Sequence, residues 1–138
     1  MSVELPEGYE PSDKEEFMND LQLEYFRLKL VEWKDSILSD SRETLNHLQE
    51  DSLKEPDIAD RASAETDWSV ELRTRDRQRK LIMKIDAALH RINEKEYGYC
   101  EVSGEPISLK RLQARPIATM TIESQEKHES YEKVHRDL

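Results

Sequence analysis

The chain has 138 residues and a formal charge of −10, with 36% hydrophobic and 38% charged residues and a mean hydropathy of −0.91. Such a composition excludes a large globular core and is typical of helices that bury one stripe, and no apolar run approaches the roughly 18 residues of a membrane span. Because there is no such span and no basic region followed by an apolar core at the N-terminus, we expect a cytosolic protein. Residues 1–63 carry the whole charge, with 17 acids against 7 Lys or Arg, which disfavours nucleic-acid binding and favours a protein partner.

The N-terminal half predicts a tail and then a long helix. Residues 1–12 contain two prolines and a glycine without periodicity, which predicts a flexible tail. Ser12 and Glu15 have capping-box spacing, so we expect a helix from Ser12 or Asp13. No Pro or Gly follows between residues 17 and 53, and apolar residues recur there with a spacing of three, four or seven. This coiled-coil-like seam comprises Leu23, Phe26, Leu30, Trp33 and Ile37, and Leu45 and Leu48 continue it less regularly.

A second helix of similar length is expected after a short turn. Pro56 interrupts the first helix because proline lacks an amide donor, and the next uninterrupted stretch runs from Ala62 to about Lys95. Two matched helices joined by a short turn should pack antiparallel, so residues 13–95 form a hairpin with its tip at about 55–62. The expected buried positions of the second helix are Trp68, Leu72, Ile82, Ile85, Leu89 and Ile92.

The C-terminal part predicts a small module and a last helix. Tyr97-Gly98-Tyr99 ends the second helix, and Gly104, Pro106 and Pro116 make residues 96–124 loop-rich. A charged helix should begin at about Ile122, and it forms the C-terminal segment 125–138. The expected fold class is mostly α: a long antiparallel helical hairpin, a small zinc-finger-like globular module and a C-terminal helix.

Two charged constellations stand out on the hairpin. Asp57 and Asp60 at the tip, with Ala62 beyond them, could ligate a hard cation or simply form a solvated turn that caps the next helix. On the second helix, Arg73, Arg77, Lys80 and Lys84 fall on one face at spacings of four, three and four. This stripe could dock an acidic protein surface or a phosphorylated ligand, or it could pair with the acidic first helix.

The module has the outline of a four-cysteine zinc site without its ligands. Cys100 is the only cysteine, and Ser103, Thr121 and Ser124 occupy the remaining positions of a paired C-x2-C spacing. Neutral hydroxyls are poor zinc ligands, so we expect no bound zinc. Cys100 also lacks an orienting group and an oxyanion loop, so we do not expect it to be a nucleophile or the chain to be an enzyme.

Four segments of the sequence together resemble the DksA family. They are EEFMN at 15–19, DIADRAS at 57–63, ELRTRDRQRKLIMKI at 71–85 and YGYCEVSGEPISLKRLQARP at 97–116. The resemblance implies a factor that enters the secondary channel of RNA polymerase, acts with ppGpp in the stringent response and does not bind promoter DNA itself.

The resemblance also implies roles for individual residues. Asp57, Asp60 and Ala62 match the family's tip motif, and Arg73 and Arg77 match basic positions near its polymerase-binding surface. Leu81, Lys84 and Arg115 match positions that line a ppGpp pocket shared with the polymerase, whereas Gln125 stands where family members carry a lysine.

The module departs from the family because only one of its four cysteines is present. We therefore expect apolar packing against the base of the hairpin to replace the metal. The side chains expected to supply this packing are Tyr97, Tyr99, Ile107, Leu109, Leu112, Ile117, Met120 and Ile122.

Other functions remain open from the residues alone. The heptad-like seam would also suit a structural coiled-coil adaptor, and acids at a hairpin tip would suit a transcript-cleavage factor of the same channel. A degenerate finger that binds nucleic acid conflicts with the net charge. A hairpin that satisfies its own seam should be monomeric.

Overall fold

The computed structural model describes the backbone of residues 3–54 and 58–136, and the side chains of residues 3–46 and 65–135. The described residues form four helices: α1 (Asp20–Lys54), α2 (Ile58–Asn93), α3 (Leu109–Ala114) and α4 (Ile122–Arg136). The chain divides into two compact units, one of Met1–Leu30 with Ala87–Leu138 and one of Val31–Asp86. We call them the base unit and the hairpin unit. The expected mostly helical fold, with a hairpin, a small module and a C-terminal helix, is confirmed.

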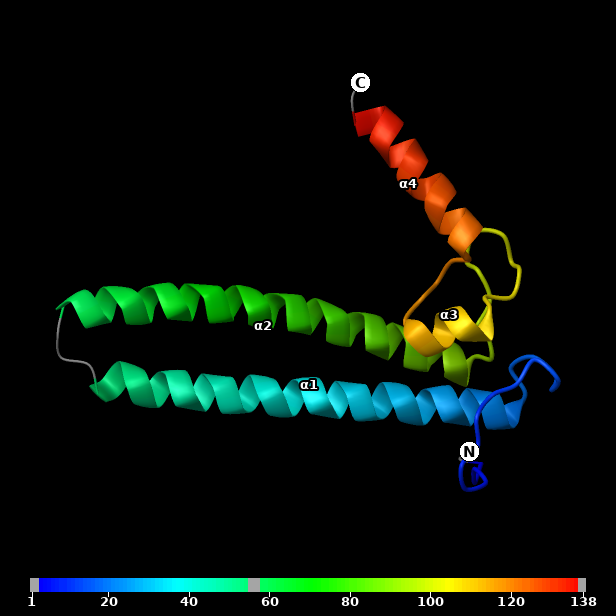
Figure 1. The fold of residues 1–138 in the computed structure, drawn as a ribbon, viewed down its shortest axis with the longest axis horizontal. Helices are drawn as coiled ribbons and strands as arrows, with labels where there is room; N and C mark the ends of the chain where they lie inside the picture. Colours follow the sequence, from blue (N-terminus) through cyan, green and yellow to red (C-terminus); the bar gives the residue numbers. More distant parts are fainter. Residues whose placement is uncertain (1–2, 55–57, 137–138) are drawn as a thin grey trace. The chain divides into compact units, whose positions relative to one another are not determined.

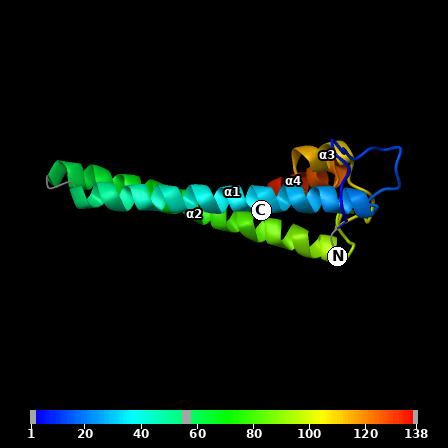
Figure 2. The same ribbon diagram turned by 90° about the horizontal axis from the view of Figure 1, so that it is seen from below.

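In the hairpin unit, the later part of α1 and the earlier part of α2 run antiparallel and side by side (Figures 1 and 2). Ile37 and Ile85 are buried between the helices, as their spacing predicts. Polar contacts between the helices join Ser41 to Gln78 and the Lys34 ammonium to the Asp86 carboxylate, the latter at 2.7 Å. Leu72 is an exception, because its side chain is 51% exposed and the prediction that it is buried is wrong.

The first helix begins seven residues later than Asp13, so the expected start is wrong. Ser12 closes a turn instead, with its carbonyl accepting from the Glu15 N–H and its hydroxyl from the Lys14 N–H. Asn19 is the actual cap, since its side-chain oxygen accepts from the Gln22 N–H at 2.9 Å. The capping-box spacing therefore marks a turn that precedes the helix.

The second helix also differs in its bounds, because it begins at Ile58 rather than at Ala62 and ends at Asn93. Its end is a Schellman motif: the Glu96 N–H donates to the Arg91 carbonyl and the Lys95 N–H to the Ile92 carbonyl. Lys95 takes the left-handed conformation, with φ 61°. This termination directs the chain into the module.

The base unit has a core to which α1, α2, α3 and the module contribute. Phe26 and Tyr97 lie 5.5 Å apart between ring centroids, and the Tyr97 hydroxyl donates to the Pro116 carbonyl at 2.7 Å. Fully buried side chains here include Phe26, Leu30, Tyr97, Ile107 and Leu112. Ile122, by contrast, is exposed, so the prediction that it packs is wrong for this side chain. Tyr99 is also exposed, although its ring meets the Phe17 ring edge-on.

Within the ranges that the structure describes, the helices lack any stretch long and apolar enough to cross a bilayer. Their length is instead used to pair with one another or to run through solvent, with charged side chains on the exposed faces. This agrees with the low mean hydropathy of the sequence.

Candidate functional site

The tip is the least described part of the candidate site. Asp57 lies outside the described residues. Asp60 and Ala62 belong to the first turns of α2, and their side chains also lie outside the described ones. The roles expected of the three residues therefore stay predictions.

The basic face of α2 is described from residue 65 onward and is exposed to solvent. Arg73, Arg77, Lys80 and Lys84 are all exposed. Lys80 pairs with Asp76 on the same helix at 3.3 Å, and Arg77 donates to the Thr74 hydroxyl at 3.4 Å. Among the described side chains, Arg73 and Lys84 have no hydrogen-bond or ion-pair partner. Thus none of the four pairs with a described side chain of α1, and the stripe remains available to a ligand or partner.

Lys80 of this face shares its carboxylate partner, Asp76, with the neighbouring Arg79. Asp76 also accepts from Arg79 at 2.9 Å, and the hydrogen bonds from Arg79 and Lys80 hold the pKa of the Asp76 carboxyl below its usual value. Leu72, Arg73, Asp76 and Arg77 line a surface hollow of about 640 Å³. The exposed Leu72 thus supplies apolar surface beside the guanidinium groups, a combination typical of a surface that binds another protein.

The residues that match the family's ppGpp positions fall in both units. Leu81, which is half-buried, and Lys84 belong to the hairpin unit, whereas Arg115 and Gln125 belong to the base unit. The Gln125 side chain donates to the Glu129 carboxylate at 3.0 Å, one turn further along α4. Arg115 is exposed, and its guanidinium has no partner among the described residues.

The four positions of the zinc-site outline lie close together through hydrogen bonds of their own. Cys100 is 3% exposed, and its sulfur accepts from the Ser103 N–H at 3.5 Å. Burial raises the pKa of this thiol, but hydrogen bonds from Ser103, Ser124 and the backbone of Thr121 outweigh burial and lower it to about 6. The Thr121 hydroxyl accepts from the Ser124 N–H at 3.2 Å.

This donor set does not fit a structural zinc ion. Zinc is held by thiolates, imidazoles or carboxylates, and the cluster offers one thiol beside three neutral hydroxyls. In the described part of the chain, no group of three or more His, Cys, Asp or Glu side chains is placed to hold a metal ion. Hydrogen bonds link these positions where a metal would link four cysteines.

A contact with the N-terminal segment holds the neighbouring turn. Gly98 has φ +94°, and a Cβ there would lie 2.8 Å from the Met18 Cγ. Met18 itself has φ 53° and is buried, and the Phe17 ring meets the Tyr99 ring edge-on at 5.3 Å. The segment before α1 therefore packs directly on the turn that carries Cys100.

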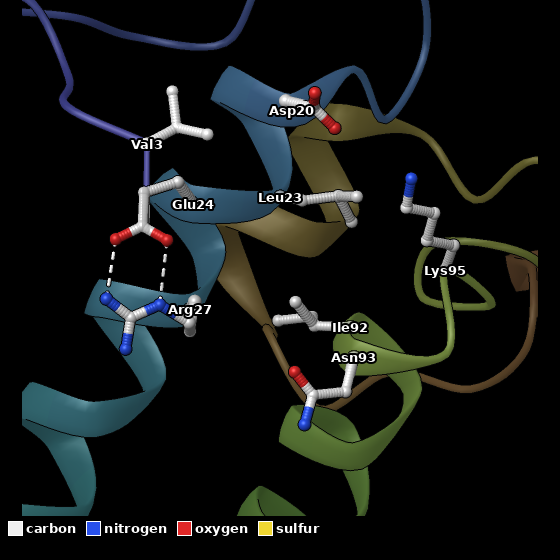
Figure 3. Close-up of a pocket in the computed structure, with 8 residues that line it drawn as sticks. All are labelled: Val3, Asp20, Leu23, Glu24, Arg27, Ile92, Asn93 and Lys95. Carbon is white, nitrogen blue, oxygen red and sulfur yellow. Dashed lines mark hydrogen bonds and ion pairs between the residues drawn. The ribbon is translucent and has the colours of Figure 1, made fainter. Parts of the chain in front are cut away.

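The sequence did not indicate a cleft that lies in the base unit (Figure 3). It has a volume of about 560 Å³ and lies between the start of α1 and the end of α2. Glu24, 7% exposed, binds Arg27 through two hydrogen bonds of 2.7 and 2.5 Å, which lower the pKa of its carboxyl. The spacing of three residues between Glu24 and Arg27 could have indicated their ion pair, although the same spacing is common on solvated helix faces. The lining residues are Val3, Asp20, Leu23, Glu24, Arg27, Ile92, Asn93 and Lys95.

Two family models match consecutive parts of the chain. Residues 22–92 match the N-terminal domain of the DnaK suppressor protein DksA, and residues 95–130 match the prokaryotic dksA/traR C4-type zinc finger. The first match covers the hairpin helices, and the second covers the module and half of α4. The order is the one that the sequence segments predict.

Full-length relatives agree with these matches. The chain is 63% identical over 129 residues to the RNA polymerase-binding transcription factor DksA of Caulobacter vibrioides, covering 94% of this chain and 91% of the relative. It is 41% identical over 117 residues to the protein of the same name from Escherichia coli K12, and the match covers 85% of this chain and 78% of that relative. The solved structure of the transcription factor DksA2 from Pseudomonas aeruginosa matches with a TM-score of 0.78 and 36% identity, over 85% of this chain and 90% of that one. The chain therefore belongs to the DksA family.

Proposed function

We propose that the chain binds bacterial RNA polymerase and regulates transcription initiation without catalysing a reaction. The observation that carries this proposal is 63% identity, over 94% of the chain, to a relative named as an RNA polymerase-binding transcription factor. The exposed cations of α2, of which Arg73 and Lys84 have no described partner, support it, because such a face attracts an acidic protein surface. The protein would act in the cytosol as a monomer, without binding promoter DNA itself.

The tip would enter the secondary channel of the polymerase, and the basic face would hold the hairpin there. Asp57 and Asp60 supply carboxylates near the catalytic centre, and Ala62 belongs to the same tip motif. Arg73 and Arg77 contact the polymerase along α2. The support for these assignments is the match of DIADRAS at 57–63 and of the α2 segment to the family pattern.

ppGpp would act as a co-regulator at the interface with the polymerase, bound by Leu81, Lys84 and Arg115. Ammonium and guanidinium groups form charge-assisted hydrogen bonds with phosphate, and both cations are exposed without described partners. Gln125 supplies no charge, so we expect the chain to bind ppGpp more weakly than a relative with lysine at this position.

The module would hold its fold without zinc, although it matches the C4-type zinc finger model. The support is the donor set: one thiol, which accepts hydrogen bonds from Ser103, Ser124 and the backbone of Thr121, and three neutral hydroxyls. The contact of Met18 with Gly98 and the burial of Tyr97, Ile107 and Leu112 supply packing in place of metal bonds.

The function can be tested by transcription in vitro from a stable-RNA promoter with the polymerase of the source bacterium. We expect the wild-type protein to inhibit initiation and ppGpp to strengthen the inhibition. The variant Asp57→Asn/Asp60→Asn should bind the polymerase but lose the inhibition, whereas Arg73→Ala/Arg77→Ala should lose binding. The two variants thereby separate action at the tip from docking.

Other outcomes would point to the other functions. A wild-type protein that neither binds the polymerase nor alters transcription would contradict the proposal and favour a coiled-coil adaptor. Cleavage of RNA in a backtracked elongation complex, lost in the tip variant, would identify a transcript-cleavage factor instead.

A further inference from the structure

The backbone around Arg115 is held on every side. Its N–H donates to the Arg111 carbonyl at 2.7 Å, and its own carbonyl accepts from the Ala118 N–H at 3.0 Å. Pro116 disfavours a helical residue before it, and Arg115 ends α3 with φ −141° and ψ 83°. The Pro116 carbonyl in turn accepts from the buried Tyr97 hydroxyl. The side chain of Arg115, by contrast, is exposed and makes no hydrogen bond with a described residue.

The residue two positions earlier ties α3 to α1. The Lys29 ammonium donates to both the backbone carbonyl and the side-chain oxygen of Gln113, at 2.9 and 3.0 Å. The Tyr25 hydroxyl donates to the same side-chain oxygen at 3.0 Å. Lys29 also lies 5.9 Å from the centre of the Tyr25 ring. One amide oxygen therefore collects two donors from successive turns of α1.

This cluster acts on the end of α3 that carries Arg115. Carbonyls in the last turn of a helix lack partners within the helix, and an ammonium group is favourable there. Lys29 satisfies the Gln113 carbonyl in this way. Since all three Lys29 contacts are made within the cluster, its charge stabilises α3 while the Arg115 guanidinium faces solvent.

We propose that Tyr25, Lys29 and Gln113 are positioning residues that hold Arg115 in place to bind the phosphate groups of a nucleotide co-regulator. The inference rests on the proposed function, in which Arg115 contacts ppGpp. A fixed backbone reduces the conformational entropy that is lost when the guanidinium binds phosphate, and so strengthens binding. Each residue would thus influence the nucleotide without touching it.

The test is a titration of ppGpp in the transcription assay, with binding of the factor to polymerase measured in the absence of ppGpp. Gln113→Leu removes the shared acceptor, and we expect the half-maximal ppGpp concentration to rise about threefold to tenfold, as for loss of one immobilised side chain. Polymerase binding without ppGpp should not change. Gln113→Glu keeps a side-chain acceptor oxygen for Tyr25 and Lys29 and should restore a nearly wild-type titration.

Two variants calibrate the assay. Arg115→Ala should abolish most of the ppGpp response, because it removes the proposed contact itself. Lys110→Ala removes an exposed cation of α3 that has no described partner, and it should titrate like the wild type. Thermal unfolding of every variant shows whether the base unit remains folded.

The outcomes distinguish the two proposals. If Arg115→Ala responds to ppGpp like the wild type, the proposed ppGpp contact fails, and the positioning role fails with it. If Arg115→Ala loses the response but Gln113→Leu keeps it, the contact stands and positioning is overturned. Positioning is also overturned if Gln113→Leu weakens polymerase binding without ppGpp, or if Gln113→Glu fails to rescue, because either result indicates a general structural defect.

Discussion

Gly98 is a position where one added carbon should destabilise the base unit. A side chain is strained at φ +94°, and an added Cβ would lie 2.8 Å from the Met18 Cγ. We therefore expect Gly98→Ala to lower the free energy of unfolding by about 1 to 3 kcal/mol. Chemical denaturation of the purified protein measures this change.

The contribution of the Met18 contact can be separated from the backbone strain. Met18→Ala removes all three side-chain atoms that approach Gly98, so Gly98→Ala should cost less in that background than in the wild type. The cost of Gly98→Ala that remains in the Met18→Ala background measures the strain of a side chain in the left-handed conformation. Equal costs in the two backgrounds would argue that Met18 does not press on the turn.

Glu24 should make stability depend on pH. Arg27 lowers the pKa of the Glu24 carboxyl in the folded protein below its ordinary value. The ion pair therefore stabilises the fold at any pH above the ordinary pKa, and this stabilisation is lost as the pH falls through the lowered pKa. We expect Glu24→Gln to cost about 1 kcal/mol at pH 7 and much less at pH 3. Denaturation of both proteins across this range measures the difference.

The matched control for this pair is Glu32→Gln. Glu32 is exposed on the same helix and has no partner among the described side chains, so its substitution should have little effect at either pH. A Glu24→Gln cost that is the same at pH 3 and pH 7 would show that the ion pair is not the cause.

At the scale of the element, the hydrophobic spacing predicted the helices but not their ends. Phe26, Leu30 and Ile37 of α1 are buried as expected, because a period of about 3.6 places them on one face of that helix, and Ile85 is buried on the facing side of α2. The start of α1 was misplaced because both Ser12 and Asn19 are good capping residues, and only tertiary contacts distinguish them. Gln22, which is fully buried, favours the start at Asn19, because its amide accepts from the Met18 N–H and donates to the Ser12 carbonyl.

Two aliphatic side chains of α2, Ile85 and Leu72, should differ strongly in how much they contribute to the free energy of unfolding. Ile85 is fully buried and Leu72 is 51% exposed. We expect Ile85→Ala to lower the free energy of unfolding by about 2 to 5 kcal/mol, and Leu72→Ala to change it by about 0.5 kcal/mol or less. Circular dichroism during denaturation compares the two variants.

Leu72→Ala should instead affect binding, because Leu72 lines the hollow beside Arg73 and Arg77. A weaker affinity for the polymerase with unchanged stability would support the proposed docking face. If Leu72→Ala unfolds as readily as Ile85→Ala, the Leu72 side chain is buried in solution and does not form part of an exposed docking face.

At the scale of the whole molecule, the sequence already indicated that the module could not close like a four-cysteine finger. It also named apolar side chains that pack in the module, but it could not indicate the hydrogen bonds around Cys100 or the contact between Met18 and Gly98. The hydrogen bonds around Cys100 depend on Ser103 and Thr121 meeting across a loop of 17 intervening residues, and the Met18 contact joins segments 80 residues apart. Such long-range pairs have no periodic signature, so only the folded chain brings them together.

A module held in this way should be indifferent to chelators. We expect the purified protein to contain no stoichiometric zinc by mass spectrometry, and its thermal unfolding to be unchanged by a strong chelator or by added zinc. The converse variant, Ser103→Cys/Thr121→Cys/Ser124→Cys, completes a four-thiol donor set, so it should bind one zinc ion and become sensitive to chelation. If chelation instead unfolds the wild-type module, Cys100 holds metal with ligands outside this cluster, and the hydrogen bonds among Cys100, Ser103, Thr121 and Ser124 are not what closes it.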